Sequence, residues 1–148
     1  MNMSLIKLIS ILSGVFGLLC GFITLLPYIG GLAFFILMCF ASIIIVSFLL
    51  RSGVLVLESV PESLTIGGII GFISYFSFSI VYIPMIILLV KVFNYTTNYG
   101  VAIFAGQANL FVILTLSVFI GIVSATINAC GAFGVYYVSE LLKKKKKK

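Results

Sequence analysis

LISILSGVFGLLCGFITLLPYIGGLAFFILMCFASIIIVSFLL, residues 8–50, runs without one charged side chain. Two more uncharged stretches, Ser63 to Val90 and Val92 to Ser139, cover most of the rest of the 148-residue chain. Charged residues make up 8% of the sequence and hydrophobic residues 63%, whereas an ordinary soluble domain has about 25% charged residues. A soluble fold needs a polar surface that this composition does not supply, so the sequence predicts an integral membrane protein.

The uncharged stretches divide into membrane spans. A helix needs roughly 20 apolar residues to cross the hydrocarbon core, so residues 8–50 suffice for two helices, and the turn signal between them is 27–31. The charged segment 51–62 is expected in water or among lipid headgroups, and 94–100 is expected to be a polar loop. Residues 101–107 fit either an interfacial segment or a backward extension of the last helix. The predicted fold class is an all-α membrane protein, a single bundle of four transmembrane helices at about 5–26, 29–50, 64–90 and 109–139.

The basic residues near the span ends predict the orientation of the bundle. Cytoplasmic loops carry an excess of lysine and arginine. With both termini inside (N-in/C-in), the cytoplasmic side carries Lys7, Arg51 and the lysine tail, and the outer side carries only Lys91. The chain therefore divides into a four-helix transmembrane domain, 1–142, and a basic cytoplasmic tail, 143–148. We expect a multi-pass protein of a plasma membrane or a bacterial inner membrane.

The lysine tail accounts for the net charge of +6, so the charge is not a patch for nucleic acid on a folded surface. The predicted partner of the tail is a bilayer with an anionic inner leaflet, where each lysine contributes about 1 kcal/mol. A second interpretation is that the run only enforces the topology. The residues predicted to contact lipid headgroups are Lys143, Lys144, Lys145, Lys146, Lys147 and Lys148.

Small residues spaced four apart predict where the helices touch. Lipid tails are as apolar as leucine, so membrane helices associate through close backbone approach, which small side chains allow. Packing within one chain is favoured over packing between copies, although both remain open. The second helix offers only Ala33 and Ala41 in such positions and is expected to be the most lipid-exposed. The predicted helix-packing residues are Ser13, Gly17, Gly21, Gly67, Gly71, Ser117, Gly121, Ala125 and Ala129.

The first and third spans share a pattern. Residues 17–24 and 67–74 both read G-x-x-x-G-F-I-[T/S], fifty residues apart. A duplicated helical hairpin would produce this match, as in transporters built from parallel repeats. Chance would also produce it, because glycine, phenylalanine and isoleucine are abundant here. Both interpretations stay open.

Ionisable side chains are missing from the spans. Such residues normally mark ion pathways and proton relays, and small four-helix multidrug transporters depend on an embedded carboxylate that this chain lacks. Paired groups for acid–base or nucleophilic catalysis are also missing. We therefore expect no enzyme, no cofactor and no metal site. The acidic residues and the cysteines, which show no metal-site spacing, are Glu58, Glu62, Glu140, Cys20, Cys39 and Cys130.

Three residues within the spans carry specific expectations. Asn128 and Tyr75 are the intramembrane polar candidates, and each predicts an interhelical hydrogen bond or, as the alternative, contact with a solute. Pro84 removes a helical hydrogen bond and predicts a kink in the third span.

Plentiful packing positions without catalytic chemistry predict a class of function. The chain is expected to be a non-enzymatic multi-pass membrane protein that acts through helix–helix contacts, as an accessory, assembly or scaffold subunit. Its partner would be another membrane protein or a second copy of the chain. The alternative is a small-solute facilitator or a holin-like oligomeric pore, suggested by the small size, the multiple spans and the basic tail.

Overall fold

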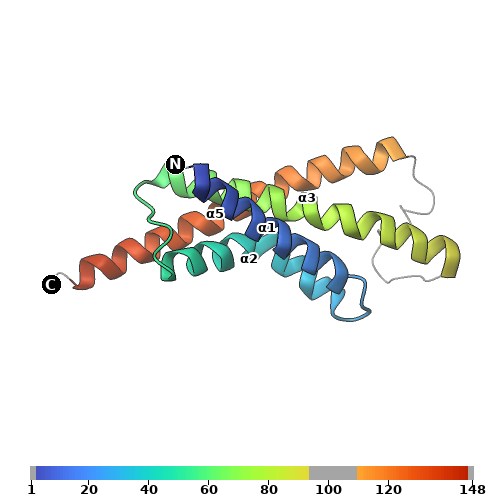
Figure 1. The fold of residues 1–148 in the computed structure, drawn as a ribbon, viewed down its shortest axis with the longest axis horizontal. Helices are drawn as coiled ribbons and strands as arrows, with labels where there is room; N and C mark the ends of the chain where they lie inside the picture. The colour runs from blue at the N-terminus through green and yellow to red at the C-terminus, as the bar shows by residue number, and fades with distance from the viewer. Residues whose placement is uncertain (1–2, 94–109, 147–148) are drawn as a thin grey trace.

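The computed structural model describes residues 3–93 and 110–146. Within these residues the chain forms a bundle of long helices (Figure 1). All of them are long and apolar enough to cross a membrane, which indicates an integral multi-pass protein in contact with the lipid bilayer. The predicted all-α fold class is confirmed. The helices are α1 (Met3–Ile23), α2 (Gly30–Arg51), α3 (Val60–Phe93) and α5 (Leu110–Lys146).

Several sequence expectations stay predictions. The predicted loop 94–100 and the ambiguous segment 101–107 lie outside the described residues, as do Lys147 and Lys148. The predicted kink at Pro84 stays a prediction, because α3 continues through this residue as a helix to Phe93.

The C-terminal helix is longer than expected. We predicted that it ends near residue 139, but α5 continues to Lys146. Lysine is a good helix former, and the Lys143 ammonium group lies 3.1 Å from the Glu140 carboxylate one turn earlier. The first four lysines of the predicted tail therefore belong to the last helix. At 1.5 Å per residue the helix is about 55 Å long, whereas the hydrocarbon core is about 30 Å thick.

The start of α3 is set by a cap that the sequence pattern S-x-x-E already contains. The backbone N–H of Glu62 donates to the Ser59 hydroxyl oxygen at 3.4 Å, and the Glu62 carboxylate accepts from the Glu58 N–H at 3.1 Å. This arrangement resembles a capping box, which satisfies N–H groups that lack partners in the first helical turn. The helix consequently begins at Val60 and not near residue 64 as predicted.

The connection between α2 and α3 is partly buried. Leu55 and Leu57 are each only 2% exposed, whereas their neighbours Val54 and Val56 face outward. The two leucines join the hydrophobic cluster at this end of the bundle. Part of the segment 51–62 is therefore buried against the bundle, because alternate side chains of an extended segment point to opposite faces. The position of this segment in water or among headgroups stays a prediction.

The helices alternate in direction along the chain. In Figure 1, α1 and α3 run one way, while α2 and α5 run the other way, so Met3 and Lys146 lie at the same end of the bundle. Whether this end faces the cytoplasm remains a prediction from the positions of the lysines and arginine.

The helix predicted to be the most lipid-exposed is in fact the most buried. Within the described residues, 39% of the α2 span is buried, compared with 17% for α5. The prediction considered only small residues, but α2 fills the centre of the bundle with large ones. Its fully or nearly fully buried apolar side chains are Leu37, Ile45, Val46 and Leu49.

Candidate functional site

Asn128 is the polar centre of the bundle. It lies on α5 with its side chain fully buried. The carboxamide oxygen accepts a hydrogen bond from the Ser42 backbone N–H of α2 at 2.8 Å. The amide nitrogen donates to the carbonyl oxygens of Met38 at 3.0 Å and Leu37 at 3.4 Å, and to the Ser124 carbonyl of its own helix at 3.0 Å. The carboxamide is thus engaged by the protein itself and joins α5 to α2.

The partners of Asn128 on α2 are four residues apart. In a regular α-helix the N–H of Ser42 and the carbonyl of Met38 would pair with each other. A side chain that binds both of these groups must donate and accept at once, and among buried neutral side chains of this size a carboxamide does so. Leucine at position 128 has neither function, and aspartate would place a charge against the Met38 carbonyl. The contact therefore depends on the chemistry of asparagine as well as its size.

Two glycines of α3 bring this helix against α5. A Cβ atom added to Gly67 would lie 2.6 Å from the Ala132 Cβ and would also meet the Asn128 carbonyl. A Cβ added to Gly71 would lie 2.6 Å from the Ser124 carbonyl oxygen. Because real Cβ atoms essentially never come within 3.0 Å of such atoms, both positions need glycine. The Ser124 hydroxyl also donates to the Gly71 carbonyl at 3.1 Å, so the close approach carries a hydrogen bond.

The small residues of α5 lie across from these glycines. The Ala129 Cα would be 2.8 Å from a Cβ on Gly67, and the Ala125 Cα would be 3.0 Å from one on Gly71. Gly121 lies in a looser place, since a Cβ there would come only within 3.3 Å of the Tyr75 ring. The contact between α3 and α5 is therefore tightest from Ser124 to Ala132 and loosens toward the beginning of α5.

A second glycine contact joins α1 to α3. A Cβ on Gly17 would overlap the carbonyl group of Ser74, and one on Gly21 would lie 3.2 Å from the Phe78 carbonyl oxygen and from the Val81 Cβ. The backbones of the two helices consequently touch at Gly17. Ser13, one turn before Gly17 on α1, is fully buried.

The packing of these glycines bears on the internal repeat. Gly17 and Gly21 face α3, whereas the matching Gly67 and Gly71 face α5. A duplicated hairpin that kept its packing would instead place the first pair against α2. The structure therefore does not repeat the contact along with the pattern, which favours chance as the origin of the match.

The hydroxyl groups of α3 turn toward different neighbours. The Ser77 hydroxyl lies 3.6 Å from the Cβ position of Gly14 on α1, whereas the Tyr75 side chain interacts with Ser117 on α5. Buried hydroxyl oxygens without a hydrogen-bond partner among the described residues belong to Ser13, Ser42 and Ser74, which lie on α1, α2 and α3.

The ionisable and sulfur-containing side chains are scattered. Throughout residues 3–93 and 110–146, His, Cys, Asp and Glu side chains form no group of three or more that could hold a metal ion. The thiols of Cys20, Cys39 and Cys130 are free, and only Cys130 is exposed. Glu62 caps α3 and Glu140 pairs with Lys143, so both carboxylates serve the helices that carry them.

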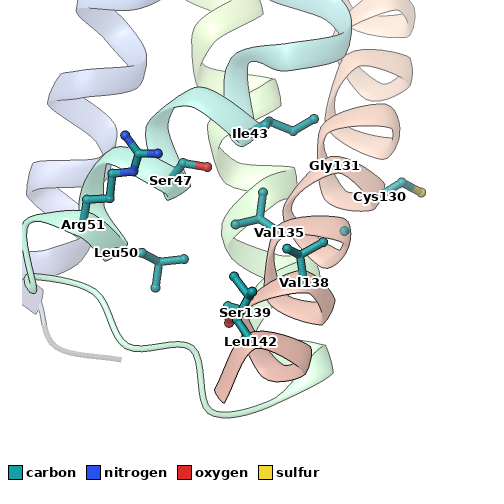
Figure 2. Close-up of a pocket in the computed structure, with 11 residues that line it drawn as sticks. Ile43, Ser47, Leu50, Arg51, Cys130, Gly131, Val135, Val138, Ser139 and Leu142 are labelled. Atoms are coloured by element: carbon teal, nitrogen blue, oxygen red, sulfur yellow. The ribbon is translucent and has the colours of Figure 1, made fainter. Parts of the chain in front are cut away.

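A groove with a volume of about 660 Å³ lies between α2 and α5, at the end of the bundle that carries the lysines. Figure 2 shows Ser47 and Arg51 on its α2 side and Val135, Val138 and Leu142 on its α5 side. The groove is lined mainly by apolar side chains. Arg51 supplies a positive charge at one end.

The sequence interpretation missed this groove, although part of its signal was present. Cys130 and Gly134 are small residues four apart on α5. Cys130 directly follows Ala129, the last of the predicted packing residues on this helix. Nothing lies within 4 Å of a Cβ added to Gly134. This pair therefore marks an open surface and not a contact, a distinction that spacing alone does not make.

Comparison with protein-family models, curated proteins and solved structures gives no match for this chain.

Proposed function

We propose that this chain is a non-enzymatic accessory or assembly subunit of a membrane complex, which acts through helix–helix contacts. The surface that we assign to the partner is the N-terminal part of α5, residues 111–120. The partner would be a transmembrane helix of another protein or of a second copy of the chain.

The observation that supports this proposal is the difference in burial along α5. No residue from 111 to 120 is buried, and Gly121 is the first that is. In Figure 1 this part of α5 stands apart from the other helices. Its exposed large side chains are Phe111, Val112, Leu114, Leu116, Val118 and Phe119.

The N-terminal part of α5 also has the features of a helix-packing surface. Thr115 is exposed there and Ser117 is half-buried. Small and hydroxyl-bearing residues such as Thr115 allow membrane helices to approach closely. Because the internal polar centre at Asn128 is occupied by α2, contacts to further helices would use other surfaces, such as the exposed side chains between Val112 and Phe119.

Site-specific photocrosslinking in native membranes tests the proposal. A photoreactive phenylalanine analogue replaces Phe119, which is 65% exposed, and in a matched variant replaces Phe35 of α2, which is 54% exposed. We expect a discrete heavier adduct from position 119 and only lipid adducts from position 35. The mass of the adduct distinguishes a second copy from another protein. Absence of a protein adduct at position 119, or identical adducts at both positions, would contradict the proposal.

A second candidate is a small-solute facilitator or a holin-like oligomeric pore. The observation in its favour is the set of buried serine hydroxyls without partners, Ser13, Ser42 and Ser74, on three of the helices. Reconstitution of the protein alone into liposomes separates the two functions. Solute flux that depends on the protein would favour the pore, whereas tight liposomes together with an adduct at position 119 would favour the subunit.

A further inference from the structure

We infer that the groove between α2 and α5 binds one anionic phospholipid from the surrounding leaflet, with an acyl chain along the groove and the phosphate at Arg51. This inference does not depend on the proposed function, because the groove and residues 111–120 lie at opposite ends of α5.

The length of the groove matches one leaflet. On α2 it extends from Ile43 to Arg51 and on α5 from Cys130 to Leu142, which at 1.5 Å per residue corresponds to about 12 and 18 Å. Half of the hydrocarbon core is about 15 Å thick. A single acyl chain running along the helices therefore fills the groove from the headgroup level to the membrane centre. A transmembrane helix of a partner crosses both leaflets and would need a groove about twice as long.

The floor of the groove is open because its residues are small. Gly134 has no atom within 4 Å of its Cβ position. The walls are apolar, formed by side chains such as Leu50, Val135 and Val138. Such an open apolar surface suits a hydrocarbon chain that also touches the surrounding lipid.

The charge at the end of the groove selects the headgroup. Arg51 is exposed, and no carboxylate among the described residues forms an ion pair with it. Glu140 of α5, which follows the groove residue Ser139, already forms an ion pair with Lys143. A guanidinium group binds a phosphate through two parallel hydrogen bonds, and basic pockets between transmembrane helices favour anionic headgroups. Ser47, one turn earlier on α2, adds a hydroxyl donor to the same wall.

Native mass spectrometry of the full-length protein in detergent tests the charge requirement. Phosphatidylglycerol and phosphatidylcholine with the same acyl chains are titrated separately. We expect one phosphatidylglycerol to be retained per chain and phosphatidylcholine to bind at least fivefold more weakly. Arg51→Gln should weaken phosphatidylglycerol binding about fivefold, the effect of one basic residue at the membrane surface. Lys7→Gln removes a charge from α1 outside the groove and should leave the affinity unchanged.

A second variant separates the groove from general attraction to the lysines. Gly134→Leu fills the groove without changing any charge, and the open space at its Cβ position means that the bundle should keep its thermal stability. We expect this variant to lose the retained phosphatidylglycerol, while Thr115→Leu, at the other end of α5, retains it. Wild-type binding by Gly134→Leu would overturn the inference and assign the lipid preference to the lysines. Equal binding of both lipids, or a dimer that Gly134→Leu dissociates, would also overturn it.

Discussion

The two parts of α5 both lack charged side chains but differ in packing. From Gly121 to Ala132 the helix lies against α3 and α2, whereas residues 111–120 contain no buried residue. The packed part contains small residues and one asparagine, and the bare part contains mostly large aliphatic and aromatic residues. Since lipid accommodates large apolar side chains as well as a protein interior does, hydrophobicity does not decide which part packs. Close backbone approach and hydrogen bonds at Asn128 decide it.

The largest effect in the contact between α3 and α5 is expected at the glycines that let the two backbones approach. Gly71→Leu would force apart α3 and the Ser124 carbonyl of α5, which a Cβ alone would approach to 2.6 Å. Overpacking of this kind should cost about 3 kcal/mol or more. Unfolding in a detergent titration series measures the loss, and Gly134→Leu, with nothing near its Cβ position, should stay within about 0.5 kcal/mol of the wild type. Equal losses in the two variants would remove the distinction between packed and open glycines.

The second effect concerns the polar contact of the packed part. Asn128→Leu removes the hydrogen bonds to Ser42 and Met38, and interhelical bonds in membranes are worth about 0.6–2 kcal/mol each. We therefore expect a loss of about 2 kcal/mol in the same unfolding titration. Thr126→Val is the matched control, since the Thr126 hydroxyl is exposed and donates only to the Ile122 carbonyl of its own helix. A loss no larger than that of the control would show that Asn128 does not hold α5 to α2.

A smaller effect is expected at the start of α3, outside the contact with α5. Ser59→Ala removes the hydroxyl that accepts from the Glu62 N–H. Loss of such a cap should cost about 1 kcal/mol. Exchange of the first amide protons of α3, followed by NMR, should become faster, while amides near Gly71 should keep their protection. Unchanged exchange at Glu62 would mean that the cap contributes nothing.

The smallest effect is expected in the bare part of α5. Phe119→Ala shortens a side chain that is 65% exposed, so the isolated protein should stay within about 0.5 kcal/mol of the wild type in its unfolding free energy. The same substitution should weaken co-purification of any partner from native membranes. A loss above about 2 kcal/mol in the isolated protein is typical of buried sites and would place Phe119 in a core.

The sequence predicted the helices well because charge and length decide them. Their ends were less accurate: the S-x-x-E pattern at Ser59 was overlooked, and Lys143 was assigned to a tail although lysine continues a helix readily. The positions of Gly67 and Gly71 followed from spacing, but their neighbour did not, since the same spacing at Gly17 leads to a different helix. The burial of α2 could not be read from its sequence, because large apolar residues suit both lipid and a bundle core.

A leucine scan along α5, from Ser117 to Ala132, tests the central claim most directly. The unfolding free energy of each variant is measured in the same detergent series. We predict small changes at exposed positions such as Val118 and Phe119, and losses that recur every three to four residues from Gly121 onward. The losses should be greatest at Ser124, which faces α3, and at Asn128, which binds α2. Losses of similar size at every position, or the greatest losses before Gly121, would contradict the claim that close approach in one part of the helix holds this bundle together.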